Sequence, residues 1–302
     1  MNSDRRSLEA SSFRTFFDNQ LHHLQELANM LGSHIRNEEQ QNVEDRQIVE
    51  SLVDASNRKI RAVHGYSGKL RKHVRALYTH VLQVADQIPP PVGLSQETFR
   101  TVPLVNALFV GSKDIDKLFQ TDPDVQAYAR IHDQHQVPVL YALLTASKSK
   151  KTTLGLAIQG DQLIRDVPQQ AVNFSLHKIH APCASRAELS AELKKYLFDR
   201  VVMVAKQEMM SRMTNQSPKT GDDCYTARVN SLANPDVYLN TLIEYIEIPS
   251  QLLSIEKSHV RLSKLGIKLG SEDNQSANEF DIHELTWGGG TRNVALQIIY
   301  TR

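Results

Sequence analysis

The sequence has no long hydrophobic run and very little cysteine. No stretch of the 302 residues approaches the roughly 20 consecutive apolar residues that a membrane-spanning helix needs. Cys183 and Cys224 are the two cysteines, too few for a disulfide framework and typical of a reducing compartment. The first ten residues, MNSDRRSLEA, lack the apolar segment of a secretory signal. We therefore expect a cytoplasmic protein without a membrane span.

An excess of charge of either sign is also lacking. There are 35 basic and 34 acidic residues, so the net charge is +1. This balance argues against a protein dedicated to nucleic acid or to a membrane surface. Hydrophobic residues make up 40% and charged residues 23%, close to the globular average. A chain of this length can bury a sizeable core and form two domains.

The common catalytic signatures are missing as well. The sequence contains no G-x-x-x-x-G-K-[ST], G-x-S-x-G, H-E-x-x-H or G-x-G-x-x-G. No cofactor is therefore indicated, and an enzyme is the less favoured interpretation. An enzyme whose site is assembled from residues distant in sequence stays open as an alternative.

The N-terminal part of the chain has the apolar spacing of a coiled coil. Apolar residues alternate at spacings of four and three from Phe17 to Ile35, and again from Val49 to Ile88, where Pro89 ends the pattern. The second run, 42–88, predicts one long helix. We call its apolar positions the seam: Val49, Val53, Ile60, Val63, Leu70, Val74, Leu77, Val81, Val84 and Ile88.

Residues 1–90 are therefore predicted to form a coiled-coil arm, and 91–302 a separate domain. A helical hairpin folded near residue 39 is the first interpretation of the arm, and one continuous helix is the second. Gly65 and Gly68 are weak points, because glycine costs up to about 1 kcal/mol relative to alanine in a helix. The seam predicts self-association through the arm, or docking of a partner protein.

Charge is segregated along the second helix of the arm. Six acids lie between residues 38 and 54, and seven bases with no acid lie between 58 and 75. Two copies laid antiparallel about Ser56 would set acid opposite base, which favours an antiparallel dimer. Alternatively, the basic face is a polyanion contact for nucleic acid, with three lysines further along the chain: Arg58, Lys59, Arg61, Lys69, Arg71, Lys72 and Arg75, with Lys148, Lys150 and Lys151.

The remainder of the chain reads as α+β. Capping patterns begin helices at Ser112, Asp122, Ser185 and Asn234. Apolar or alternating runs predict strands; they lie at 137–146, 152–159, 170–180, 252–269, 280–287 and 293–300. The lysine-rich segment 147–151 is expected to be a hairpin tip, and Gly288–Gly290 a turn. Runs of helices and strands favour a mainly antiparallel sheet of about six strands with packed helices.

His177, His180 and Cys183 are metal-ligand types spaced three apart. In a strand that spacing splays the side chains to both faces, so we expect no joint zinc site. With no catalytic signature, the pattern favours an interaction protein: a dimeric adaptor or regulatory protein built on a coiled coil. Nucleic-acid binding through the basic face is the alternative.

Overall fold

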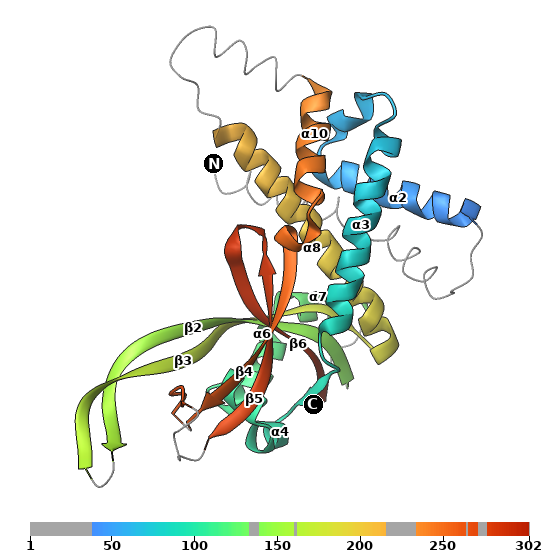
Figure 1. Ribbon diagram of the computed structural model, residues 1–302. Coiled ribbons are helices and arrows are strands. Elements are labelled where there is room, and N and C mark those ends of the chain that lie inside the picture. Colours follow the sequence, from blue (N-terminus) through green and yellow to red (C-terminus); the bar gives the residue numbers. More distant parts are fainter. Residues whose placement is uncertain are drawn as a thin grey trace, which may run out of the picture. The chain divides into compact units, whose positions relative to one another are not determined.

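The computed structural model describes residues 38–132, 139–159, 162–215, 234–263, 265–270 and 277–301. The first apolar stripe, 17–35, which was predicted to form one helix of the hairpin, lies outside the described residues. The chain divides into two compact units, each made of two separate segments (Figure 1). Unit 1 is Met1–Leu82 with Lys194–Leu252, and unit 2 is Gln83–Leu193 with Leu253–Arg302. The predicted division after residue 90 had placed 194–252 in the second part.

The described part of unit 1 is helical. The 3₁₀ helix η1 packs against α10, and the ring of Tyr78 on α3 meets that of Phe198 on α8 edge to face at 5.4 Å. The elements are α2 (Glu38–Ser56), η1 (Arg58–Ala62), most of α3 (Tyr66–Gln87), most of α8 (Arg186–Asn215), α10 (Pro235–Ile246) and α11 (Pro249–Leu252).

The single helix predicted over 42–88 is wrong, because the chain turns between α2 and α3. Asn57 is extended at φ −153°, and its side chain accepts the backbone N–H of Lys59 at 2.9 Å, which starts η1. Gly65 then takes φ +70°, a conformation that costs glycine little and other residues more. The local conformations of Asn57 and Gly65 therefore turn the chain, although the apolar spacing of the seam continues across the turn.

Unit 2 confirms the expected α+β class and its mainly antiparallel sheet of six strands. The strand order is β3-β2-β6-β5-β4, and β1 pairs with β6 in parallel while the other pairs are antiparallel. The strands are β1 (Val92–Leu94), β2 (Val139–Gln159), β3 (Gln162–Cys183), β4 (Leu253–Leu262), β5 (Asn278–Trp287) and β6 (Thr291–Thr301). The turn predicted at Gly288–Gly290 is η2, between β5 and β6.

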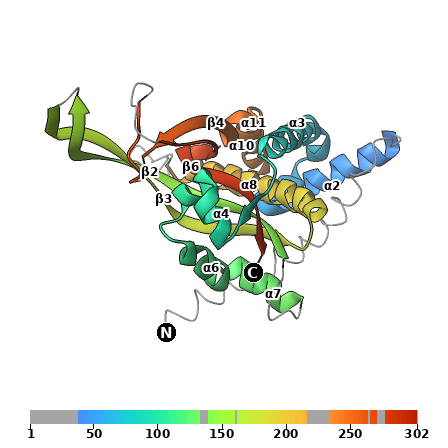
Figure 2. The same ribbon diagram turned by 90° about the horizontal axis from the view of Figure 1, so that it is seen from below.

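One face of this sheet packs against short helices to form the core of unit 2 (Figure 2). The helices are α4 (Gln96–Thr101), α5 (Pro103–Leu108), α6 (Ser112–Thr121) and α7 (Pro123–Ile131). Asp122 caps α7, as predicted, by accepting the backbone N–H groups of Asp124 and Val125. Its second oxygen accepts the N–H of Ile179 at 3.0 Å, which fixes α7 to β3. Because Asp122 is buried, these bonds satisfy a group that would otherwise be costly to bury.

The hairpin tip predicted at 147–151 is wrong. That segment lies inside β2, a 21-residue strand, and the turn comes later, where Gln159 pairs with Gln162 (Figure 1). β3 carries three bulges opposite β2, each with one positive-φ residue: Asp166, Leu176 and Ala181. Because of the second bulge, Leu176 is 73% exposed, although its place in the alternation predicted a row shared with Val172 and Phe174.

A short segment bridges the two edge strands of the sheet. Residues 266–268 bond Ser263, the residue after β4, and form a bridge with Leu262 at the end of β4. They bond β3 through Gln170 and Val172. Gly266 lies close to β3 and has φ +75°. A Cβ on this residue would lie 3.2 Å from the carbonyl oxygen of Val172. The sheet is therefore curved enough for its edges to meet at this point, beyond which β2 and β3 continue alone.

Candidate interaction surfaces

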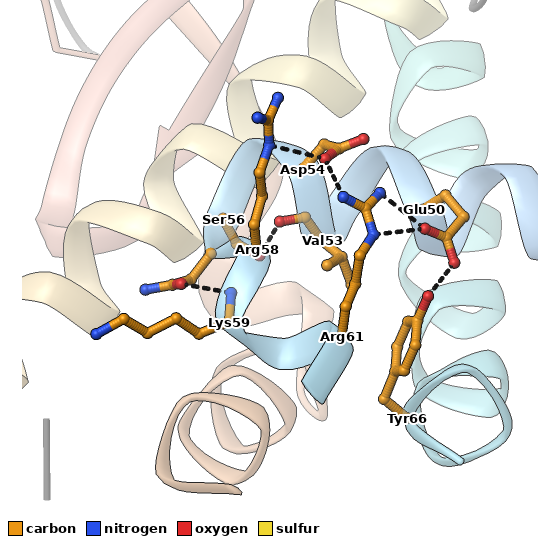
Figure 3. Close-up of polar contacts among 9 residues, drawn as sticks. Glu50, Val53, Asp54, Ser56, Arg58, Lys59, Arg61 and Tyr66 are labelled. Atoms are coloured by element: carbon orange, nitrogen blue, oxygen red, sulfur yellow. Dashed lines mark hydrogen bonds and ion pairs between the residues drawn. The ribbon is translucent and has the colours of Figure 1, made fainter. Parts of the chain in front are cut away.

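Three arginines of the basic face predicted in unit 1 pair with the acidic stretch of the same chain; Figure 3 shows Arg58 and Arg61. Arg61 donates two N–H groups to Glu50, at 3.0 and 2.8 Å, and a third to Asp54 at 2.7 Å. Arg58 donates to Asp54 at 3.1 Å, and Arg75 lies 3.1 Å from Asp45. The turn at η1 thus brings acid and base together within one chain, where the sequence had predicted pairing between two chains.

The electrostatics of this cluster follow from its contacts. Hydrogen bonds to Asp54 and then Glu50 raise the pKa of Arg61, and the bond from Arg61 lowers the pKa of Asp54. Tyr66 donates to Glu50, which raises the pKa of its hydroxyl. The contacts therefore favour the charged forms of Arg61 and Asp54 and the neutral hydroxyl of Tyr66. The cluster is therefore an ion-pair network that holds the turn rather than an unsatisfied site.

These pairings leave fewer cations for the polyanion contact that the sequence predicted. Three of its seven cations in unit 1 are held by carboxylates, and the ammonium of Lys59 lies over the ring of Tyr238 at 5.3 Å. Lys69 and Lys72 are exposed on α3. Of the lysines on β2, Lys148 lies inside, where it pairs with the buried Glu284 of β5. What is left for phosphate is a few exposed lysines rather than a continuous face.

The seam is covered within the chain. All ten of its side chains are buried, from Val49 to Ile88. A second chain would reach them only if these helices separated. The seam explains the packing of the described helices and leaves little apolar surface for a partner.

The ends of β2 and β3 carry exposed apolar side chains that lie close together along the two strands. We call residues 152–159 of β2 and 162–170 of β3 the distal ribbon; Figure 1 shows it leaving the sheet. Leu154 is 68% exposed and Leu156 is 55% exposed. They share alternation with Ala142, Leu144 and Ala146, which face the core, although Lys148, Lys150 and Thr152 lie between the two groups in the same row. The side of β2 that faces the core in unit 2 therefore extends into the distal ribbon, where Leu154 and Leu156 are exposed.

The opposite face of the distal ribbon is filled by a polar side chain. Gln169 lies over Gly155 and donates its Nε2 to the carbonyl of Leu156 at 2.8 Å. A Cβ on Gly155 would fall 2.1 Å from the Gln169 amide oxygen. Only a residue without a side chain admits this arrangement. One face of the ribbon is thus polar and closed, and the other is apolar and open.

The three proposed metal-ligand types have separate structural contacts. His177 stacks on Phe109 with ring centroids 4.8 Å apart, and His180 hydrogen-bonds the hydroxyl of Thr145 at 3.1 Å. Cys183 donates its thiol to the Tyr141 carbonyl at 3.5 Å, and burial raises its pKa to about 12. Across the described ranges, no group of three or more His, Cys, Asp or Glu residues is placed to hold a metal ion.

No helix among the described segments is both long and apolar enough to cross a membrane. Comparison of the chain with protein-family models, curated proteins and solved structures found no match.

Sequence reasoning missed the distal ribbon, and it missed Glu284 as the partner of Lys148. The lysines at 147–151 resemble a polar break between two strands, although β2 continues through them to Gln159. Lys148 and Glu284 are 136 residues apart, so no local pattern could have joined them.

Proposed function

We propose that the chain is a cytoplasmic adaptor or regulatory protein that acts by contacting other proteins, and that the distal ribbon makes the contact. The observation that supports this is the exposure of Leu154 and Leu156 on a two-stranded projection. An isolated pair of strands is at best marginally stable in water, and further strands or a packed helix stabilise it. A partner that covers the leucines would supply that stabilisation at about 25 cal/mol per Å² of apolar area.

The coiled-coil part of the proposal rests on the stripe at 17–35, which lies outside the described residues. The buried seam from Val49 to Ile88 supports a role in packing this chain instead. We place the protein in the cytoplasm on its cysteine usage, which suits a reducing compartment. An enzyme is not favoured, because ion pairs, as at Asp54, or burial, as at Cys183, account for the shifted pKa values of the described groups.

Site-specific photo-crosslinking in cells tests the proposal. A photoreactive amino acid at position 154 should form discrete protein adducts, and the adducts should disappear when Leu156→Lys is added. The same group at Ile131, which is 79% exposed at the end of α7, is the matched control. Equal labelling from positions 154 and 131 would contradict the proposal.

Nucleic-acid binding is the second candidate, supported by the exposed Lys150 and Lys151 beside the distal ribbon. A two-stranded ribbon fits the major groove of duplex DNA. Binding of this kind would be weak, indifferent to sequence and strongly dependent on salt, since phosphate contacts carry no sequence information. Fluorescence anisotropy of a labelled duplex across salt concentrations, with Lys150→Gln and Lys151→Gln together, measures it.

A further inference from the structure

The two edges of the distal ribbon differ in whether they can accept another strand. On β3, residues 170–172 are already bonded to the segment 266–268. Further out, the bulge at Asp166 and the missing N–H of Pro168 interrupt the same edge. Bulges and prolines of this kind protect edge strands from pairing. The β3 edge is therefore covered or blocked.

The β2 edge has none of these protections. Among the described strands, β6 pairs with β2 only from Val139 to Ala146, so beyond that point β3 is the strand whose backbone pairs with it. Residues 152–159, TTLGLAIQ, contain no charge and no proline. This combination of β-branched and apolar residues without charge is the signature of a segment that pairs with its own copy. An unprotected edge of this kind is a ready template for another strand.

We infer that the β2 edge of the distal ribbon pairs with the same edge of a second copy of this chain, antiparallel about Gly155. This names the partner for the contact surface proposed above and rests on that proposal. The two ribbons would form one four-stranded sheet in the order β3-β2-β2-β3. Antiparallel pairing about a two-fold axis uses the same surface on both copies, so the assembly closes as a dimer.

Charge and apolar pairing select this orientation and register. With Gly155 on the axis, Leu154 of each copy lies opposite Leu156 of the other, and both leucine pairs share the open apolar face. Lys151 then lies opposite Gln159, an uncharged residue. Parallel pairing in register would set Lys150 and Lys151 of the two copies side by side, which like-charge repulsion disfavours. The lysines also limit the open segment at one end, as charges that flank pairing-prone segments do.

The decisive measurement is the solution mass of the full chain at micromolar concentration by sedimentation velocity. We expect the mass of two chains for the parent, and half that mass for the double variant Leu154→Lys with Leu156→Lys. The matched control carries the same two changes at other exposed apolar positions, Leu176→Lys with Ile131→Lys, and should keep the mass of two chains. Circular dichroism of each variant establishes that it is folded.

Hydrogen exchange gives a second readout that needs no substitution. The amides of 152–159 should exchange faster when the parent is diluted below its dissociation concentration, while those of β6 should not change. A monomeric parent would overturn the inference, yet crosslinks from position 154 to a different protein would still uphold the proposed function. A dimer that survives the Leu154 and Leu156 changes would also overturn it. Monomers that bind a DNA duplex through Lys150 and Lys151 would assign the ribbon to nucleic acid instead.

Discussion

Arg61 holds Glu50 with two hydrogen bonds, although the residues are eleven positions apart and lie in different helices. The bonds exist because Asn57 and Gly65 turn the chain between α2 and α3. A long helix would have carried the same two residues on separate turns. Acidic and basic residues of this region therefore pair within one chain.

Arg61→Met should lower the free energy of unfolding by about 1 kcal/mol, because exposed ion pairs contribute roughly 0.2–1 kcal/mol each and this residue serves two acids. Urea denaturation at low salt measures the loss, which should shrink as salt screens the charges. The control is Lys69→Met, an exposed cation on α3, with an expected change within about 0.5 kcal/mol. Equal losses for the two variants would show that the network contributes nothing.

The same network has a pH signature. Arg61 lowers the pKa of Asp54 below its ordinary 3.8, so the folded carboxylate resists protonation more than the unfolded one. Its contribution is therefore complete above the unfolded pKa and is lost as pH falls through the lowered folded value. The difference in stability between the parent and Arg61→Met should accordingly narrow below about pH 4.

The sequence predicted which seam residues are buried, but it could not say which chain covers them. The seam at Leu77 has the same spacing whether a helix of the same chain or a helix of another chain covers it. The turn at Asn57 was also hidden, because Val53, Ile60 and Val63 keep the spacing of a continuous helix across it. Apolar periodicity therefore predicts which residues are buried, but it does not predict where the chain turns or which chain covers them.

Leu77→Ala should destabilise the chain by roughly 2–5 kcal/mol without changing its solution mass, because the side chain is fully buried. Denaturation and sedimentation of the same sample separate the two effects. Thr79→Ala, an exposed change two residues along α3, should be within about 0.5 kcal/mol of the parent. If Leu77→Ala halved the solution mass and left the stability unchanged, the seam would be an interface between chains.

The strands and helix caps were more predictable than the arm. Asp122 and Asn234 began helices where local capping chemistry placed them, and alternation located β5 and β6 closely. The course of β2 was missed, because three lysines in five residues resemble a turn. One of them, Lys148, is instead compensated by a carboxylate that only the folded sheet brings near it.

Gly266→Ala should cost roughly 1–3 kcal/mol, because it puts a Cβ on a residue at φ +75° and 3.2 Å from the Val172 carbonyl. The bridge between β3 and β4 would loosen, which faster exchange of the Val172 amide should report. Gly68→Ala is the matched control: a Cβ there meets open space near the start of α3. It should leave stability unchanged or raise it by up to about 1 kcal/mol. Similar losses of stability for Gly266→Ala and Gly68→Ala would show that the bridge between β3 and β4 does not depend on the glycine at position 266.

His177 should make the stability of unit 2 depend on pH below about 7. Within the described part of the chain its Nε2 is buried without a hydrogen-bond partner, and its ring stacks on Phe109. Burial lowers its pKa, against a smaller opposing effect from a hydrogen bond with the Leu108 backbone and from the charge of Asp114. The unfolded chain therefore binds a proton at a pH where the folded chain does not.

It follows that stability falls as pH drops below the unfolded histidine pKa of about 6.5, and that this loss ends below the lowered folded value. His177→Phe keeps the stacked ring and removes the titration, so the slope of unfolding free energy against pH should become shallower. His283, whose pKa burial and Lys257 also lower, keeps part of the slope, and His283→Phe in the same background should remove more of it. Urea denaturation at closely spaced pH values measures both steps. A slope in His177→Phe equal to that of the parent would show that the buried Nε2 is protonated as easily in the folded chain as in the unfolded one.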